Sequence, residues 1–256
     1  MISRLVTVPG GRVEVLDLPG DENRAPLLFL HEGLGSVGLW RGYPARIAAA
    51  TGRRVVAYSR FGHGSSDPPP ARPDTRFLHE EASFVLPALR GMLGLTAPVL
   101  IGHSDGASIA LLHTLSCAAL RPVTGLVLLA PRVFVEEAGL RAIAVTRELF
   151  ELSDLRARLA KHHDDPDTAF HGWNDVWLDP TFRSWDLRPE LAGITCPILA
   201  IQGTADRYGT TAHVEAIRSE VTGPVEVLLL DGGHSPHLDH PDTVTTAITT
   251  FLATLP

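Results

Sequence analysis

Three side chains of complementary chemistry follow three apolar segments of the sequence. Ser104 stands in the pentapeptide GHSDG, Asp206 in the stretch QGTAD and His234 in the stretch GGHSP, each directly after an apolar run. A serine hydroxyl needs an imidazole as base, and the imidazole needs an acid that fixes its tautomer. The order serine, aspartate, histidine therefore predicts a nucleophilic triad of Ser104, Asp206 and His234.

Two glycines flank Ser104 at a spacing of two residues on each side, Gly102 and Gly106. A serine on a sharp turn from a strand into a helix has a strained backbone and lies close to neighbouring backbone, where glycine avoids clashes. The turn places the hydroxyl at the carboxyl end of a strand and at a helix N-terminus, which favours developing negative charge. The alternative is a helix-capping serine with incidental glycines.

Other residues near these positions offer alternatives for the acid and the base. Asp231 precedes His234 at the same strand end, and we expect it to support the loop. His237 and His240 follow closely, and their spacing also permits a metal site, but the triad accounts for His234 without a metal. We interpret His103, next to the nucleophile, as a packed histidine that supports it.

A hydrolytic serine also needs backbone donors for an oxyanion. The N–H of Asp105, immediately after the serine, supplies one donor. We expect the second from the loop in the stretch LFLHEGLGSVGLW, where Gly33 and Gly35 allow N–H groups to turn inward. Gly33 is the predicted donor, and the alternative is an ordinary glycine turn.

The elements that must position these residues follow from the pattern of the chain. Short, continuous apolar runs alternate with helix-period segments, which indicates a doubly wound, mostly parallel α/β sheet. The segment at 3–18 alternates around Gly10 and Gly11 and predicts an antiparallel hairpin at the sheet edge. We therefore predict an eight-stranded sheet. Its runs buried on both faces are 27–30, 55–58, 99–102, 126–130, 198–203 and 225–230.

One long interval, at about 132–191, lacks any strand signal. It is too long for a simple loop and should carry its own helices. We predict that residues 133–191 form a helical cap inserted after the sixth strand, and that 1–132 and 192–256 form the core domain. Within the cap we interpret residues 161–165, with the sequence KHHDD, as a solvated helix end.

Aromatic residues of the cap recur at helical spacing, which is more typical of the cap's own core than of a pocket wall. Some of them would nevertheless suit an apolar pocket for a substrate of modest size. The recurring aromatics are Phe170, Trp173, Trp177, Phe182 and Trp185. The candidate pocket residues are His31, Glu32, Leu34, His103, Trp173, Trp177 and Trp185.

Composition narrows the range of functions. The 256 residues carry a formal net charge of −7, which argues against binding to duplex nucleic acid. Lys161 is the only lysine, which argues against Schiff-base chemistry. Cys117 and Cys196 suggest two buried thiols rather than a disulfide or a metal site. The sequence has neither a signal-peptide pattern nor an apolar stretch long enough for a membrane span, so we expect a cytoplasmic protein.

These motifs together resemble the α/β-hydrolase superfamily, in its capped, single-domain, esterase-like branch, over essentially the whole chain. The resemblance implies that Ser104 is the nucleophile, Asp206 the acid and His234 the base. It also places the cap after the sixth strand. The matching stretches are LFLHEGLGS, SRFGHGSSD, GHSDG, QGTAD and GGHSPHLDHP.

The chemistry implied by this resemblance is cleavage of a carboxylic ester through an acyl-enzyme, with a small-molecule acyl substrate and no metal or organic cofactor. A serine nucleophile argues against the haloalkane dehalogenase and epoxide hydrolase branches, which use a carboxylate. The same triad can cleave an amide, a lactone, a thioester or a C–C bond beside a ketone. A non-catalytic binding protein on this scaffold is the alternative from another class. The oligomeric state stays open.

Two carboxylates depart from the family's pattern. Glu32 follows His31 where the family usually has His-Gly, and Asp105 follows the nucleophile where the family often has a neutral residue. An unpaired carboxylate beside a developing oxyanion opposes catalysis, so we expect each to point away or to be paired. The alternative is that one of them binds a substrate amine, as in aminopeptidase-like relatives.

Overall fold

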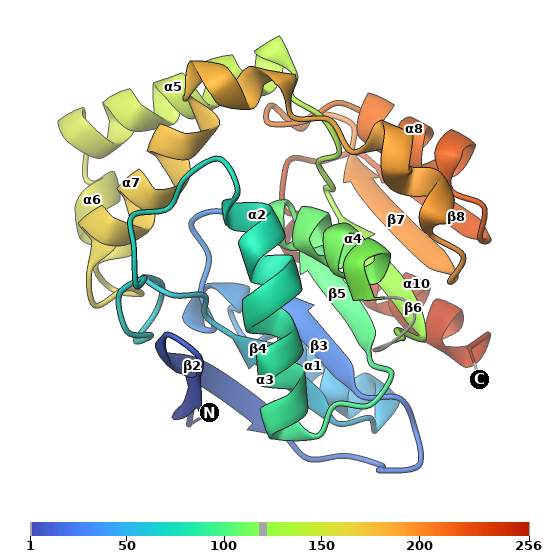
Figure 1. Cartoon of the computed structure of the whole chain (residues 1–256). Helices are drawn as coiled ribbons and strands as arrows, with labels where there is room; N and C mark the ends of the chain where they lie inside the picture. The colour runs from blue at the N-terminus through green and yellow to red at the C-terminus, as the bar shows by residue number, and fades with distance from the viewer. Residues whose placement is uncertain (1, 118–121, 256) are drawn as a thin grey trace.

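The fold is built around one eight-stranded sheet in the order β1-β2-β4-β3-β5-β6-β7-β8 (Figure 1). The structure is a computed structural model that describes residues 2–117 and 122–255, with the side chain of Cys117 outside the described part. β1 and β2 form the predicted hairpin, β2 also pairs antiparallel with β4, and the other neighbours are parallel. The strands are β1 (Arg4–Val8), β2 (Gly11–Leu18), β3 (Leu27–Leu30), β4 (Val55–Tyr58), β5 (Val99–His103), β6 (Gly125–Leu129), β7 (Ile198–Gly203) and β8 (Val225–Leu230).

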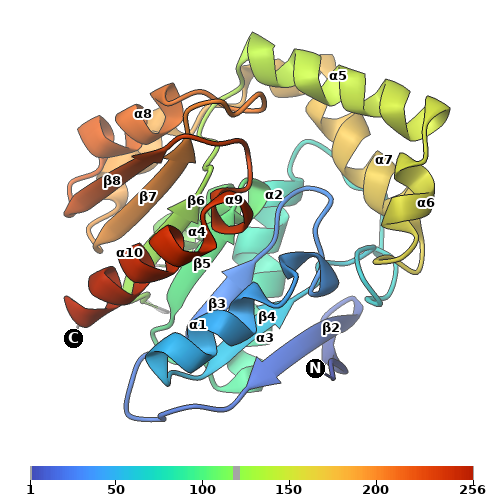
Figure 2. The same ribbon diagram turned by 180° about the vertical axis from the view of Figure 1, so that it is seen from behind.

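Helices cover both faces of this sheet, as the two opposite views show (Figures 1 and 2). On one face α1 and α10 enclose a core with Ile47, Ile248 and the odd-numbered side chains of β3 and β5. On the other face α2, α3, α4 and α8 enclose a second core, which extends to the cap aromatics. The helices are α1 (Tyr43–Thr51), α2 (Phe77–Glu80), α3 (Leu86–Leu93), α4 (Asp105–Cys117), α5 (Glu137–Leu152), α6 (Leu155–Leu159), α7 (Pro166–Trp177), α8 (Ala212–Glu220), α9 (Pro236–Asp239) and α10 (Pro241–Ala253).

The central strands are buried on both faces because each has a strand on either side and helices above and below. All four residues of β3 and all five of β5 are buried. The prediction of burial on both faces is wrong for β8, whose residues are partly or fully exposed. β8 pairs only with β7 and therefore forms the sheet edge, and an apolar run alone does not reveal that position.

The segment between β6 and β7 contains α5, α6 and α7, which lie over one end of the sheet (Figures 1 and 2). Two short 3-10 helices, η3 (Pro180–Ser184) and η4 (Arg188–Gly193), return the chain to β7. This matches the predicted interval without strands. The division into a core and a 133–191 cap stays a prediction about domains. Within the described residues, no helix is long and apolar enough to cross a membrane.

Candidate active site

Ser104 lies on the sharp turn between β5 and α4. Its φ is +51°, in the left-handed region that a residue with a side chain rarely adopts, and it is only 4% exposed. Its backbone N–H donates to the carbonyl of Leu129 (2.9 Å), and its own carbonyl accepts from Ala107 (2.9 Å). The neighbouring strand and the first helical turn therefore hold the strained residue in place, as local backbone strain requires.

The flanking glycines are needed for close backbone approach. A Cβ on Gly102 would lie 2.4 Å from the carbonyl oxygen of Gly106, and a Cβ on Gly106 would lie 2.0 Å from that of Leu30. Both approaches are too short for any side chain. The glycine spacing thus lets β5, α4 and the end of β3 meet at the serine, which agrees with the sequence prediction of a tight strand-to-helix turn.

Asp206 and His234 meet across the loops that follow β7 and β8. Nδ1 of His234 donates to Oδ2 of Asp206 (2.7 Å). The carboxylate also accepts from the Gln202 amide (2.9 Å) and from the backbone N–H of Tyr208 (2.8 Å). These bonds orient the acid and fix the tautomer of His234, so its Nε2 is left as the basic nitrogen.

Burial and pairing act in opposite directions on this pair. Burial lowers the pKa of His234 below its usual range, and the hydrogen bond to Asp206 offsets part of that fall. Burial raises the pKa of Asp206, but His234 together with the hydrogen bonds from Tyr208 and Gln202 holds the pKa of that carboxyl below its usual value. The imidazole is therefore neutral and the carboxylate charged at neutral pH, which is the state a general base requires.

Ser104 and His234 line one cavity of about 390 Å³ beneath the cap. The described residues show no hydrogen bond from the serine hydroxyl to His234, a contact that is often long before substrate binds. Of the predicted pocket residues, Glu32, Leu34, His103 and Trp173 line this cavity together with Gly33. Its other lining residues are Arg132, Ala205, Arg207, Tyr208, Gly233 and Ser235.

The loop after β3 lines the cavity and contacts the cap. A Cβ on Gly33 would lie 2.1 Å from the Trp173 indole, and a Cβ on Gly35 would lie 2.3 Å from the Glu32 carboxylate. Glycine at these positions therefore allows the indole to pack on the loop and allows Glu32 to fold back. The N–H groups of Gly33 and Asp105 donate no hydrogen bond within the described chain, so both are free for a ligand.

Three buried histidines lie against three consecutive carbonyls of this loop. Nδ1 of His31 donates to the Glu32 carbonyl (2.7 Å), Nε2 of His63 lies 2.9 Å from the Gly33 oxygen, and Nε2 of His163 donates to the Leu34 carbonyl (3.0 Å). Burial lowers the pKa of each histidine, to about 3 for His63. We call His31, His63 and His163 the carbonyl-binding histidines.

His163 also accepts from the backbone N–H of Gly64 (3.0 Å), so it joins the cap to two core loops. The interpretation of 161–165 as a solvated helix end is therefore wrong for His163, which is buried. Its neighbours do not reveal this, because the contacts lie 99 and 129 residues away in sequence.

Glu32 and His103 form a second carboxylate–histidine pair beside Ser104. Oε2 of Glu32 lies 3.4 Å from Nδ1 of His103, and Nε2 of His103 donates to the backbone carbonyl of His234 (2.7 Å). The first contact is an ion-pair distance without hydrogen-bond alignment. Burial alone would raise the pKa of Glu32, but His103 lowers it to about 2. Burial alone would lower the pKa of His103, but the neighbouring Glu32 carboxylate raises it above its usual value.

Asp105 is fully buried beneath the cap. Its Oδ2 accepts from the Trp177 indole N–H (3.3 Å), and burial raises the pKa of this carboxyl. The Arg132 guanidinium lies over the same indole, with Cζ 3.7 Å from the ring centroid, in cation–π geometry. The Trp177 indole thus contacts both the buried Asp105 carboxyl and the buried Arg132 guanidinium, and it does not line the cavity.

The other predicted positions have structural surroundings. His31 and Trp185 do not line the cavity. Trp185 stacks on Phe182 (5.5 Å), and both rings pack against Trp177 within the cap. Trp173 is therefore the one residue among the five recurring cap aromatics that lines the Ser104 cavity.

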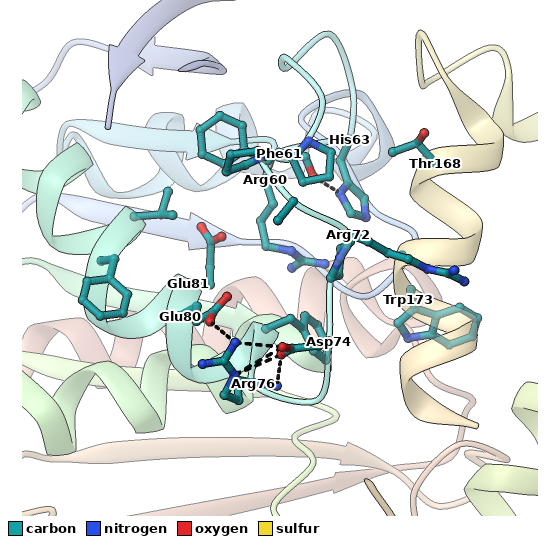
Figure 3. Close-up of a pocket in the computed structure, with 18 of the residues that line it drawn as sticks. Arg60, Phe61, His63, Arg72, Asp74, Arg76, Glu80, Glu81, Thr168 and Trp173 are labelled. Carbon is teal, nitrogen blue, oxygen red and sulfur yellow. Dashed lines mark hydrogen bonds and ion pairs between the residues drawn. The ribbon is translucent and has the colours of Figure 1, made fainter. Parts of the chain in front are cut away.

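A second cavity, of about 370 Å³, lies on the other side of Trp173. Trp173 and Thr168 of α7 form one wall, and Glu80 and Glu81, at the junction of α2 and the π-helix η2 (Glu81–Val85), form the opposite wall (Figure 3). Its arginines are paired with protein groups. Arg60 donates to the carbonyls of His31 and Glu32, Arg72 to Asp175, and Arg76 to Asp74.

The alternatives raised around His234 have other partners. Asp231 is exposed, and its carbonyl contacts Nε2 of His240. His237 is buried against Trp40 and Tyr43, and burial lowers its pKa to about 3. Among the described residues, no group of three or more histidine, cysteine, aspartate or glutamate side chains is arranged to hold a metal ion.

The two cysteines were predicted to be buried thiols. Cys196 is a free, partly buried thiol whose pKa burial raises to about 11. The side chain of Cys117 lies outside the described residues.

Comparison with known proteins identifies the family. Residues 27–247 match the model of the alpha/beta hydrolase family, and the chain belongs to this family. A proline iminopeptidase from Lactobacillus delbrueckii subsp. lactis is 34% identical over 91 residues, which are 36% of this chain and 31% of that protein. A pimeloyl-[acyl-carrier protein] methyl ester esterase from Xylella fastidiosa (strain M12) is 38% identical over 120 residues, 46% of this chain and 45% of that protein.

The matches to these curated relatives span about a third to a half of the relatives' length. Among solved structures, an esterase from Exiguobacterium antarcticum has a TM-score of 0.77 at 20% identity and covers 99% of this chain and 100% of that chain. At this identity the likeness concerns the fold. The protein is therefore an alpha/beta hydrolase whose relatives include an esterase and a peptidase.

Proposed function

We propose that this protein is a serine hydrolase that cleaves a carboxylic ester or a related acyl substrate through an acyl-enzyme. The observation that carries the proposal is the strained Ser104 in the same cavity as His234, whose Nδ1 is bound to Asp206. Strain of this kind persists where the surrounding structure enforces it, and it is common at active sites. A serine that served only to cap α4 would not need the left-handed conformation.

In the proposed reaction, Ser104 Oγ attacks the ester carbonyl while Nε2 of His234 accepts the hydroxyl proton. The carbonyl π electrons move to oxygen, and the N–H groups of Gly33 and Asp105 bind the resulting oxyanion. Collapse breaks the bond to the leaving alcohol, which takes the proton back from His234. Water then repeats the sequence on the acyl-enzyme and releases the acid and free Ser104.

The carbonyl-binding histidines support the assignment of Gly33. The carbonyls of Glu32, Gly33 and Leu34 each have a histidine nitrogen within 3.0 Å, and the Gly33 N–H donates no hydrogen bond within the described chain. Donors held in place before the reaction stabilise the oxyanion without reorganisation, and the loss of one costs about 10²–10³ in rate.

The acyl substrate class stays open within this chemistry. The same triad can act on amides, lactones, thioesters or a C–C bond beside a ketone. The second carboxylate, Glu32, gives no particular support to binding of a substrate amine, because His103 already lies against it. A binding protein without turnover would not need the hydrogen-bonded pair of His234 and Asp206.

Initial rates on p-nitrophenyl esters of increasing acyl length, for wild type and Ser104→Ala, test the proposal. A rate that depends on Ser104 and has a chain-length optimum supports ester hydrolysis. Labelling by a fluorophosphonate separates the remaining cases. Labelling without ester turnover indicates another acyl substrate, and absence of both contradicts the proposed serine hydrolase.

A further inference from the structure

Arg132 is a buried cation whose guanidinium lies on the Trp177 indole but has no acidic partner among the described residues. It follows β6, it is only 1% exposed, and it lines the cavity that contains Ser104 and His234. Its Nε and Nη2 have no hydrogen-bond partner, and the described residues provide no carboxylate within ion-pair distance of its guanidinium. Buried charges in proteins are normally paired, so this arrangement calls for an explanation.

The acids closest to Arg132 are bound to other groups. Asp206 accepts from His234, and Asp105 accepts from the Trp177 indole. Glu136 accepts from the backbone and hydroxyl of Thr210 (2.9 and 2.7 Å). Burial lowers the pKa of Arg132 to about 10, which still leaves the guanidinium charged at neutral pH. The charge is thus retained but not neutralised by direct contact.

The second cavity provides a contrast within the same molecule. Its three arginines, Arg60, Arg72 and Arg76, all donate to backbone carbonyls or carboxylates, and Figure 3 shows the bonds of Arg76 to Asp74. On the Ser104 cavity, by contrast, Arg132 lacks an acidic partner, and so does Arg207, an exposed residue whose side-chain contacts among the described residues are with Tyr208. Of the arginines that line these two cavities, those without an acidic partner among the described residues are the two at the cavity with the nucleophile.

We propose that Arg132 is a binding residue for a carboxylate of the substrate, so that the substrate class is an ester or related acyl compound with a free carboxylate group. This inference rests on the proposed function of Ser104. A guanidinium presents a planar fork of donors that matches a carboxylate, and such charge-assisted bonds are the stronger ones in proteins. The substrate would supply the partner that the protein lacks.

The charge balance of the cavity favours one negative charge over two. Glu32 lines the same space. Its carboxyl remains ionised at neutral pH because His103, which lies beside it, lowers its pKa. A dianionic phosphate would meet repulsion from this carboxylate with a single buried guanidinium to offset it. A monoanionic carboxylate can bind Arg132 while its ester group lies at Ser104.

The test compares esters that differ by one charge. For the acyl half, mono-p-nitrophenyl adipate and suberate are compared with p-nitrophenyl hexanoate and octanoate. For the alcohol half, 4-acetoxybutanoate is compared with butyl acetate by pH-stat. The readout is the ratio of kcat/KM for the charged ester to that for its neutral partner. We expect a ratio well above one for at least one pair in the wild type.

In Arg132→Met we expect this ratio to fall about 10- to 100-fold, since a hydrogen bond to a charged group is worth about that much. Arg132→Lys should retain part of the preference, and it replaces the Met variant if the latter does not fold. The matched control is Arg141→Met, because Arg141 is exposed on α5 of the same segment. The proposal is overturned if no pair favours the charged ester, or if the ratio survives in Arg132→Met.

Binding without turnover separates this inference from the proposed function. Adipate is titrated calorimetrically into Ser104→Ala and into the same protein with Arg132→Met. Saturable binding that is lost with Arg132 supports the carboxylate site, even if no ester is hydrolysed. Absence of adipate binding in Ser104→Ala, together with hydrolysis of neutral esters by the wild type, contradicts the site but leaves the serine hydrolase in place.

Discussion

Two cavities of nearly equal size meet at Trp173, and they differ in the condition of their polar groups. The cavity of about 390 Å³ has a strained serine, a base held by an acid, and a buried arginine without an acidic partner among the described residues. The cavity of about 370 Å³ has arginines that are bound to protein acceptors. Volume therefore does not distinguish them. The two cavities differ in their unsatisfied and strained groups. A native fold retains such groups only where the surrounding structure or a bound ligand offsets their cost.

The largest expected effect contrasts a substitution in each cavity. His234→Ala should lower kcat/KM for p-nitrophenyl esters by at least about 10³-fold, because Ser104 loses its base. Arg76→Ala, in the second cavity, should change it by less than about threefold. Steady-state rates with both purified variants provide the measurement. Equal losses would mean that the second cavity takes part in turnover.

The second prediction concerns stability and the histidine that lines the second cavity, His63. Because burial depresses its pKa to about 3, its stabilising contribution is complete above pH 6.5 and declines as the pH falls below that value. At pH 5 it should have lost about 2 kcal/mol, or about 30-fold in the unfolding equilibrium. Urea unfolding at pH 7 and pH 5 measures this loss, and His63→Gln should reduce it. An unchanged pH difference in the variant would contradict the assignment.

The third prediction concerns the first cavity and the fall of kcat/KM at acidic pH, which reports protonation of His234. Since the pKa of His234 is lowered by burial, kcat/KM should be level above about pH 6.5 and fall tenfold per pH unit below a midpoint under that value. Asp206→Asn removes the contact that supports the charged imidazole, so its midpoint should shift to lower pH. A midpoint above pH 6.5 in the wild type would be inconsistent with this geometry.

The fourth prediction tests the wall that the two cavities share. In Trp173→Ala the indole no longer separates them, and the optimum among p-nitrophenyl esters should move to longer acyl chains. We expect about a fivefold gain for long esters relative to short ones. Trp185→Ala is the matched control, since Trp185 lines neither cavity. An optimum that stays in place would show that the second cavity is closed to the acyl chain.

The smallest effect is expected for Glu32→Gln. Because His103 already pairs with this carboxylate, the preference between cationic and neutral substrates should change by less than about twofold. Paired rates on an amino-acyl ester and its uncharged analogue measure that preference. A tenfold or greater loss of preference for the cationic ester would revive the idea that Glu32 binds a substrate amine.

The features that the sequence predicted well depend on local spacing. Continuous apolar runs predicted six strands within one residue of their bounds, and the glycines around Ser104 predicted the tight turn whose φ is +51°. Both follow from residues that are near one another in the chain. The pairing of His234 with Asp206, which the chain order suggested, needed only the rule that carboxyl ends of parallel strands share an edge.

What could not be predicted depends on contacts between distant segments. Helical spacing groups the cap aromatics on one face, but only the packed structure shows that Trp173 meets Gly33. His163 lies in a charged run that is typical of a solvated helix end. Arg132 follows a predicted apolar strand, and this position alone could have suggested that it lies near the active site. That it lacks an acidic partner is visible only in three dimensions.

The two hydrogen bonds of His163 also join one corner of the cap to the loop that carries Gly33 and to the loop that carries Gly64. This one imidazole receives the Gly64 N–H and holds the Leu34 carbonyl, so any motion that lifts this corner of the cap must break both bonds. Hydrogen exchange at the Gly64 amide therefore reports the opening of the cap. The same motion removes one of the contacts that hold the loop of Gly33, because Leu34 loses its bond to His163 while His31 and His63 still lie against the carbonyls of Glu32 and Gly33.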